Sequence, residues 1–482
     1  MKDSLFKKFL AFSYGNWLGL IIGFGTTMVT TRLLATEDFG RASMFTLAVN
    51  IIMIFIMFGS DQAFIRYFYE VKEEQRGRLL YRTMKTPVIS VLITAAVLLI
   101  FRVRISELLF DEKNPMAVVM LVIGITAQLG DRFSRLVIRM QQKGALYSFL
   151  EVLLKVISFV SLLGFYYLLG PSYEIIIYST VISLLAIFAI AVFKEKRFWF
   201  VKTGEPLAET YSRRRILRFG MPFMVTSLIT WLFESFDKIA IRSWSTLDEL
   251  GLYSAAFKIV ALVHVFQITF NNFWTPVCYE HYQKKPDDTE FYARMMRVIS
   301  LGMFTVGIGS IAGKDIIIAF LGSDYRAAAN IMPYLIFMPM LHTISETTVM
   351  GINFMKKPKW HIFIAGTSCV SNIIGNAILV PEYGAIGAAI STALAYVIFF
   401  TLRTVISNRF YPVKQNLLQF YFMLALIFAY ATFSIYTRSI LLNMGAGFAL
   451  FLFMLLLYKK DTKDGIAYIK SMDLRKILKR RK

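Results

Sequence analysis

Apolar stretches of about twenty residues recur along the whole chain, and this feature limits the possible folds more than any other. Hydrophobic residues make up 57% of the 482 residues, charged residues make up only 17%, and the mean hydropathy is +0.58. A soluble domain carries about 25% charged residues, whereas a helix needs roughly 20 apolar residues to cross a hydrocarbon layer about 30 Å thick. The alternating ten-residue segments typical of an outer-membrane barrel do not occur. We therefore expect an all-α, polytopic integral membrane protein.

The apolar runs predict about 14 transmembrane helices, an even number that places both termini on one side. Lys and Arg gather in alternate gaps, such as 71–85, 194–216 and 354–361, while the gap GPSYE at 170–174 carries none. Basic loops stay in the cytoplasm, so both termini are expected there. The same bias accounts for the net charge of +22, and nucleic acid is not expected as a partner. The predicted spans are 10–32, 43–65, 85–103, 116–137, 147–169, 175–193, 217–240, 251–274, 295–312, 328–352, 361–380, 385–403, 417–437 and 440–458.

A short internal repeat indicates how these helices are grouped. Residues 38–51 (DFGRASMFTLAVNI) align with residues 249–262 (ELGLYSAAFKIVAL), 211 positions later, as acid, apolar and Gly, followed by Ser. Both turns face outward by the charge count, which indicates parallel halves; a chance acid–Gly turn is the alternative. The predicted division is a six-helix bundle at 1–193, a cytoplasmic linker at 194–216, a second pseudo-symmetric six-helix bundle at 217–403, two extra helices at 404–458 and a basic cytoplasmic tail at 459–482.

Three segments resemble a known family. They are Arg32–Gly40 (RLLATEDFG), Phe58–Glu70 (FGSDQAFIRYFYE) and Pro381–Tyr396 (PEYGAIGAAISTALAY). The first two resemble the N-terminal signature of Wzx-type polysaccharide flippases, the O-antigen and exopolysaccharide exporters of the multidrug/oligosaccharidyl-lipid/polysaccharide superfamily. The resemblance implies two six-helix bundles around a central cavity in a bacterial cytoplasmic membrane. It also implies ion-coupled, alternating-access transfer of undecaprenyl-diphosphate-linked oligosaccharide, as in lipopolysaccharide assembly, from the cytoplasmic to the outer leaflet.

Charged residues inside the predicted spans are the candidate substrate contacts, because each costs roughly 2.5–3.5 kcal/mol on insertion scales. Lys155 and Lys258 lie about two turns inside their spans and offer positive charge to a diphosphate. The alternatives are an i,i+4 pair between Lys155 and Glu151 and snorkelling of Lys258 to the surface. The candidate diphosphate- or sugar-binding residues are Lys155, Lys258, Arg32, Arg66, Lys238, Asn271, Asn272 and Trp274.

Carboxylates inside the spans are the candidate sites for a coupling ion, H⁺ or Na⁺, because such groups form relays in transporters. The alternative is structural: Glu234–Lys238 and Asp131–Arg135 also stand at i,i+4, and Asp61 could link to another helix. A lone His264 is expected to be a core residue. The candidate ion-coupling residues are Asp61, Glu151, Glu234, Asp237 and Glu346.

Several motifs are absent, and their absence argues against an enzyme. The chain contains no P-loop, no HExxH sequence and no nucleophile elbow, and its four histidines show no metal spacing. We expect no cofactor or metal. The expected partners are lipid-linked oligosaccharide, membrane lipids, H⁺ or Na⁺, a glycan polymerase and a chain-length regulator. The alternatives are a multidrug or cation exporter, a peptidoglycan lipid-precursor flippase, or a membrane-embedded glycan polymerase or ligase, which commonly needs a larger external loop.

Overall fold

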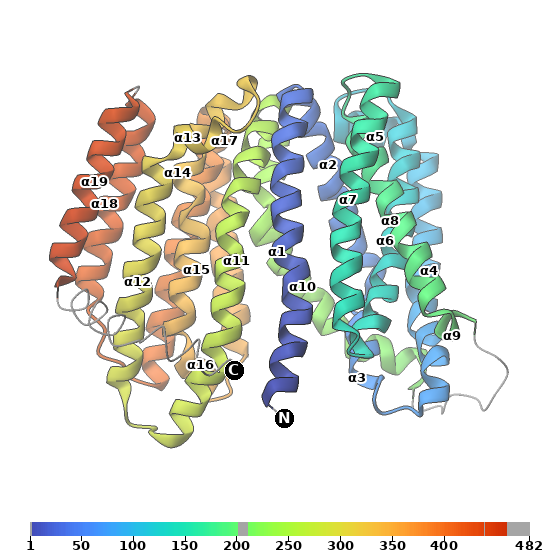
Figure 1. Ribbon diagram of the computed structural model, residues 1–482, viewed down its shortest axis with the longest axis horizontal. Coiled ribbons are helices and arrows are strands. Elements are labelled where there is room, and N and C mark those ends of the chain that lie inside the picture. The colour runs from blue at the N-terminus through green and yellow to red at the C-terminus, as the bar shows by residue number, and fades with distance from the viewer. Residues whose placement is uncertain (1, 201–210, 438, 460–482) are drawn as a thin grey trace. The chain divides into compact units, whose positions relative to one another are not determined.

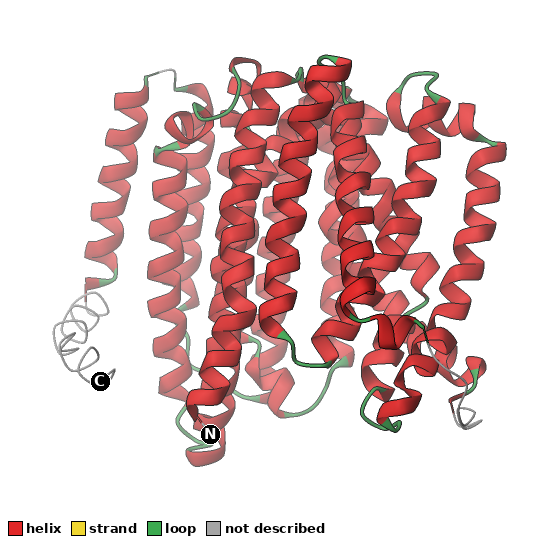
Figure 2. Cartoon of the chain, turned by 45° about the vertical axis from the view of Figure 1, so that its right-hand side comes forward, coloured by secondary structure: helices red, strands yellow, loops and turns green. Residues whose placement is uncertain are grey.

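The computed structural model describes residues 2–200, 211–437 and 439–459, and within them the chain is helical without a strand (Figures 1 and 2). Helices are expected because hydrocarbon offers no hydrogen-bond partners, so each spanning segment must pair its own backbone groups. Part of the predicted linker, 201–210, and the predicted tail from 460 onward lie outside the described residues. The all-α, membrane-spanning prediction is confirmed.

The chain divides into two compact units, Met1–Ser254 (unit 1) and Ala255–Lys482 (unit 2). In unit 1, α7 packs against α1 and α8, and α6 packs against α8. Phe64 and Phe133 meet edge to face in its core, with ring centroids 6.3 Å apart. The helices of unit 1 are α1 (Lys2–Leu33), α2 (Thr36–Met57), α3 (Ser60–Tyr67), η1 (Glu73–Gln75), α4 (Arg76–Ile100), α5 (Arg102–Phe110), α6 (Pro115–Met140), α7 (Gly144–Leu169), α8 (Glu174–Lys194), α9 (Lys196–Trp199) and α10 (Arg213–Trp244).

Unit 2 begins within α11 and is built around α15, which packs against α12 and α17. The 52-residue α17 contains a non-helical residue, Gly384 (φ 53°), so it holds two arms that match the predicted spans 361–380 and 385–403. The helices are α11 (Leu247–Lys284), α12 (Thr289–Ala312), α13 (Lys314–Ile318), η3 (Ser323–Asn330), α14 (Met332–Leu335), α15 (Phe337–Thr348), α16 (Met350–Phe354), α17 (Lys359–Phe410), α18 (Leu417–Tyr436) and α19 (Ile440–Leu457).

Every predicted span is largely helical, but the spans 43–65, 85–103 and 328–352 are each divided among shorter helices, and 361–380 and 385–403 share α17. The number of membrane crossings is a separate question. Ten described helices are long and apolar enough to cross a membrane, or eleven if Ser323–Asn330 and Met332–Thr348, bent by 49°, form one broken span. The count of fourteen stays a prediction. So do the predicted domain boundaries, which differ from the division of the chain within α11.

The two copies of the predicted repeat motif contact each other inside unit 1. A Cβ atom at Gly40 would lie 3.2 Å from the Gly251 backbone nitrogen, and one at Gly251 would collide with the Thr36 carbonyl. The Thr36 hydroxyl donates to Asp248 Oδ1 at 2.5 Å beside this contact. The aligned glycines therefore allow the start of α2 and the start of α11 to pack backbone against backbone.

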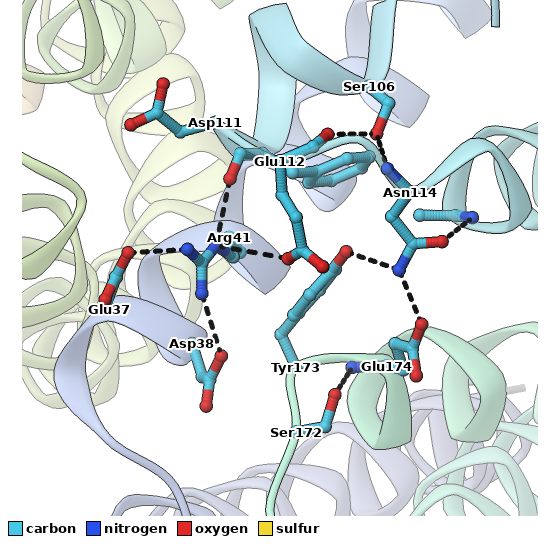
Figure 3. A network of polar contacts seen from close by, with 12 residues as sticks. Glu37, Asp38, Arg41, Ser106, Asp111, Glu112, Asn114, Ser172, Tyr173 and Glu174 are labelled. Carbon is cyan, nitrogen blue, oxygen red and sulfur yellow. Dashed lines mark hydrogen bonds and ion pairs between the residues drawn. The ribbon is translucent and has the colours of Figure 1, made fainter. Parts of the chain in front are cut away.

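Polar contacts join three helix ends at the predicted outer end of unit 1 (Figure 3). We call these contacts the Arg41 network. Arg41 of α2 pairs with Glu37 at 2.6 Å, and its Nε donates to the Phe110 carbonyl at 2.9 Å. Asn114, which caps α6, donates to Glu174 at 2.6 Å and to the Tyr173 hydroxyl at 2.8 Å. The network fastens the α5–α6 turn to the starts of α2 and α8. Its other labelled members are Asp38, Ser106, Glu112 and Ser172, whereas Asp111, also labelled, pairs with Arg242.

Candidate functional site: a polar pocket in unit 1

A break in the second predicted span creates the candidate site. The sequence predicted one helix over 43–65, but α2 ends at Met57, and Phe58 (φ 46°) and Gly59 (φ 66°) are both left-handed. Glycine adopts this conformation without the steric cost that a Cβ brings. A Cβ at Gly59 would also lie only 2.7 Å from the Cα of Gly220. The break therefore brings α10 against the α2–α3 junction.

An ion pair lies directly after this break. Asp61, in the first turn of α3, accepts from Arg132 of α6: Nη2 lies 2.5 Å and Nε 3.2 Å from the same carboxylate oxygen. The Asp61 side chain is 7% exposed, whereas that of Arg132 is 50% exposed. Arg132 Nη1 bonds no residue in the described part of the chain. The guanidinium is thus anchored on one side and keeps donors for a ligand on the other.

The exposed side of Arg132 borders an open pocket of about 220 Å³ that α2, α3, α6 and α10 line. Asp61 and Arg132 are the two charged residues of its lining, and their opposite charges offset each other. The other polar groups of the lining are uncharged amides and hydroxyls. Guanidinium forks match phosphate oxygens, and amides can both donate to and accept from hydroxyl groups. The lining residues are Asn50, Met53, Ile54, Met57, Gly59, Asp61, Gln62, Gln128, Arg132, Phe223, Met224, Ser227 and Trp231.

Three further charged residues lie near Arg132. Asp131 and Arg135 are within one turn of it on α6, and Glu151 lies on the neighbouring α7. Arg135 pairs with Asp131 on its own helix and, at 2.5 Å, with Glu151 of α7. The predicted Asp131–Arg135 pair is therefore present. Glu151 uses Arg135 as its partner, and no ion pair between Glu151 and Lys155 occurs among the described residues. Arg135 therefore bridges one carboxylate of its own helix and one of α7.

Unit 2 holds a buried ion pair of its own. Arg403 of α17 donates to Glu346 of α15 at 2.8 Å and to Ser345 Oγ at 2.6 Å. His342, one turn before Glu346, lies 3.7 Å from the same carboxylate and within 2.5 Å of Gln267 Nε2. This polar cluster joins α11, α15 and α17.

The pocket contains one of the predicted site residues, Asp61, and the others lie elsewhere. Within unit 1, Arg66 ends α3 and pairs with Glu70 at 2.5 Å on an exposed surface. Arg32 is exposed in the last turn of α1. Lys155 is partly exposed, and its Cγ would lie 3.9 Å from a Cβ at Gly19 of α1. Their proposed roles stay predictions.

Two predicted carboxylates and one predicted lysine share a stretch of α10. Asp237 is buried and accepts from the Tyr253 hydroxyl at 2.5 Å. Glu234 is exposed and forms no ion pair within the described residues, whereas Lys238 is partly buried. The structure therefore gives Asp237 a local hydrogen-bond role, and the ion-coupling roles of Asp237 and Glu234 stay predictions.

The remaining predicted residues lie in unit 2. Lys258 is exposed on α11, and the side chain of Asn272 lies outside the described residues. Trp274 is fully buried, and its Nε1 donates to the Glu346 carbonyl at 3.1 Å. Asn271 Oδ1 is buried and has no hydrogen-bond partner in the described part of the chain. Trp274 thus packs within the core beside the Arg403 cluster.

Sequence reasoning missed the main polar residues of the pocket, although a signal was present. Gln128 and Arg132 stand four residues apart on α6, and Ser227 and Trp231 stand four apart on α10. Residues four apart lie on one helix face. A search for i,i+4 pairs of polar or aromatic residues within apolar spans would have found both faces.

A helical bundle with a polar pocket lined by apolar spans defines a multi-pass membrane protein with a transporter-like architecture. A family model for polysaccharide biosynthesis proteins matches residues 5–280, and the chain belongs to this family. Two proteins from Haloferax volcanii are similar in sequence: the probable low-salt glycan biosynthesis flippase Agl15 (21% identity over 250 residues, 51% of each chain) and the probable flippase AglR (24% over 193 residues, 38% of each). The matches thus span about half or less of these relatives.

Two solved structures share the fold. One is the inward closed conformation of the lipid II flippase MurJ, with a TM-score of 0.70 and 15% identity, covering 94% of this chain and 99% of that chain. The other is an inward-facing multidrug resistance MATE family transporter of the MOP superfamily, with a TM-score of 0.58 and 14% identity, covering 82% and 94%. At these identities the likeness concerns the fold alone.

Proposed function

We propose that this protein is a flippase that moves undecaprenyl-diphosphate-linked oligosaccharide from the cytoplasmic to the outer leaflet of a bacterial cytoplasmic membrane. Both termini would lie in the cytoplasm, and transfer would occur by alternating access coupled to H⁺ or Na⁺. A glycan polymerase and a chain-length regulator would act on the exported glycan. The family membership, the fold and the flippase names of the relatives support this proposal.

The observation that carries the proposal is the half-exposed Arg132 in a pocket of uncharged polar residues. A diphosphate would take the guanidinium donors that Asp61 leaves free, and sugar hydroxyls would pair with Asn50, Gln62 and Gln128. A cation exporter needs a net negative site, and here Arg132 offsets the Asp61 carboxylate. The pocket thus favours an anionic head group with hydroxyls over an organic cation.

Reconstitution into liposomes tests the proposal. A fluorescent undecaprenyl-diphosphate oligosaccharide is placed in both leaflets, and a membrane-impermeant quencher reports the fraction that crosses. Wild type should flip the lipid, and Arg132→Ala should reduce the rate at least about tenfold, which corresponds to roughly 1.4 kcal/mol of lost binding in the rate-limiting step. Arg132→Lys should keep part of the rate, because charge remains while the fork is lost.

A matched control is Arg294→Ala, which removes an exposed arginine of α12 that forms no ion pair among the described residues. It should flip at the wild-type rate. If Arg132→Ala flips the lipid at the wild-type rate, the pocket does not bind the substrate. Failure of wild type to flip the lipid, with export of a cationic drug in the same liposomes, would favour the multidrug exporter instead.

A further inference from the structure

Asp131 carries an oxygen that the structure leaves without a partner. Its side chain is 1% exposed, and Oδ2 pairs with Arg135. The other oxygen, Oδ1, is buried and accepts no hydrogen bond from any residue in 2–200, 211–437 or 439–459. A buried carboxylate oxygen without a donor forgoes its hydration at a large free-energy cost. A small positively charged species at Oδ1 must reduce this free-energy cost.

The charges around Asp131 do not balance. Arg132 is engaged by Asp61, so Arg135 is left to serve both Asp131 and Glu151. The charged groups that act on the Asp131 carboxyl are Arg135, Glu151 and Arg132, from α6 and α7. From α8, the ring of Phe188 packs at Gly130 and contributes no charge. Two carboxylates on one guanidinium leave one excess negative charge in an apolar bundle.

A divalent metal ion is a poor candidate for the missing positive charge. No group of three or more His, Cys, Asp or Glu residues that could hold a metal occurs in the described residues. Lys155, one turn along α7 from Glu151, makes no ion pair within the described chain, and its stem lies beside Gly19 of α1. A proton needs no coordination shell and would turn the unpartnered oxygen into a hydroxyl.

We propose that Asp131 is a proton-binding site, protonated on Oδ1 while Arg135 pairs with Glu151. Protonation removes the excess charge and makes the buried side chain neutral, which costs far less than burying an unpaired carboxylate. When the proton leaves to water, Asp131 becomes a carboxylate that competes with Glu151 for Arg135 and attracts the adjacent Arg132.

The position of Asp131 links this proton to the pocket. Arg132 is the next residue of α6 and is the cation of the pocket. A second negative charge beside Arg132 would compete with an anionic ligand, so proton binding and anion binding should favour each other, and by linkage the effect is reciprocal. This coupling rests on the proposed function, whereas protonation of Asp131 does not.

Infrared spectroscopy of the protein in lipid tests the proton directly. Wild type at neutral pH should show the C=O band of a protonated carboxylic acid that exchanges slowly in D₂O. The band should shift when all aspartates carry a ¹³C carboxyl carbon and should not shift when all glutamates do. It should vanish in Asp131→Asn, and also in Glu151→Gln, which leaves Asp131 as the one counter-ion of Arg135.

The control is Glu195→Gln, since Glu195 is also buried, at 2% exposed, but has its own cation, Lys143. The band should persist in this variant. Absence of the band from wild type, a shift with ¹³C-glutamate, or persistence in Asp131→Asn would overturn the proposal. The labelled wild-type spectra decide between aspartate and glutamate even if Asp131→Asn does not fold.

A pyrophosphate-binding measurement distinguishes failure of the proton site from failure of the proposed function. If proton and anion binding are linked, the affinity of wild type should fall by up to about tenfold per pH unit as Asp131 ionises, and the affinity of Asp131→Asn should not follow that slope. An affinity of wild type that is independent of pH would overturn the linkage. No pyrophosphate binding in the presence of the infrared band would contradict the pocket and still support the proton site.

Discussion

Arg403 is a nearly buried cation of unit 2. Its side chain is 8% exposed, it donates to Glu346 and Ser345, and its guanidinium lies 5.0 Å from the centre of the Phe399 ring. Arg403→Met would leave the Glu346 carboxylate buried and unpaired. Removing one partner of a buried pair costs about 3–5 kcal/mol. We expect a matching loss of unfolding free energy, measured by denaturant unfolding in detergent.

The double change Arg403→Met with Glu346→Gln provides the control, because it removes both charges. It should recover most of the lost stability, since replacing a buried pair by neutral groups is often close to neutral. If the double variant is as unstable as Arg403→Met, the hydrogen bond to Ser345 and the ring contact with Phe399 carry the stability instead.

Local sequence rules predict ion pairs within one helix but not ion pairs between helices. Asp131 and Arg135 stand at i,i+4, and the sequence predicted their pair. The partners Asp61 and Arg132 are 71 residues apart, and Glu346 and Arg403 are 57 apart. Such pairs depend on which helices become neighbours, and no spacing within one helix contains that information. The sequence therefore identified both carboxylates and neither arginine.

At the scale of elements, the contact of Gly59 with Gly220 sets how closely α10 approaches the α2–α3 break. Gly59→Ala places a Cβ in a left-handed residue, which costs roughly 1–2 kcal/mol, and against the Gly220 backbone, where overpacking costs about 1–3 kcal/mol. We expect a total loss of about 2–5 kcal/mol and a strong fall in the yield of folded protein. Thermal unfolding followed by size-exclusion chromatography measures both.

Gly164→Ala in α7 is the matched glycine control, since a Cβ at that position meets nothing within 4 Å. Alanine is the better helix former by roughly 0.8–1 kcal/mol, so this variant should be as stable as wild type or more so. Equal stability of Gly59→Ala and wild type would show that α10 can move away from the break without cost.

The start of α12 gives a pH-dependent test. Asp288 caps this helix by accepting from the Phe291 N–H at 3.3 Å, and it bonds His281 Nε2 at 2.9 Å. Burial raises the pKa of Asp288, but these hydrogen bonds and the nearby His281 and Lys285 outweigh it, so the pKa lies below its ordinary value. A lowered folded-state pKa stabilises the protein above about pH 3.9, and that contribution is lost as the pH falls further.

Asp288→Asn keeps a good capping side chain but cannot ionise. Its unfolding temperature should lie below that of wild type at pH 7, and the gap should close as the pH falls through the folded-state pKa. Asp287→Asn, at the neighbouring exposed position, should follow the wild-type curve. A gap between Asp288→Asn and wild type that stays constant down to acid pH would assign the effect to the cap and not to the charge.

At the scale of the whole molecule, the orientation in the membrane stays a prediction that labelling can test. Cysteines are introduced one at a time into a variant in which the buried Cys278 and Cys369 are replaced. A membrane-impermeant thiol reagent added outside cells should label positions 171–174 and should not label 194–216 or 459–482. Labelling of 194–216 from outside would reverse the orientation of every proposed site.

Helix placement was predictable from the sequence because one physical rule governs it. Apolar runs must form helices in hydrocarbon, and every predicted span is largely helical. The break at Phe58 and Gly59 was not predicted, because the apolar pattern continues through it and the contact that needs it lies on α10, far along the chain. Local composition thus determines where helices occur, whereas the break in the second span depends on a contact with a distant helix.

The Arg41 network gives unit 1 an uneven stiffness. Ion pairs and hydrogen bonds tie the starts of α2 and α8 to the α5–α6 turn, so a force on any one of these segments is carried by the other two (Figure 3). The far end of α2, by contrast, stops at two left-handed residues beside the pocket. The first turn of α2 is therefore held in place by the Arg41 network, whereas its last turn is not held by it. Strain that ligand binding introduces at Arg132 should therefore be absorbed at the Phe58–Gly59 break and not at the Arg41 network.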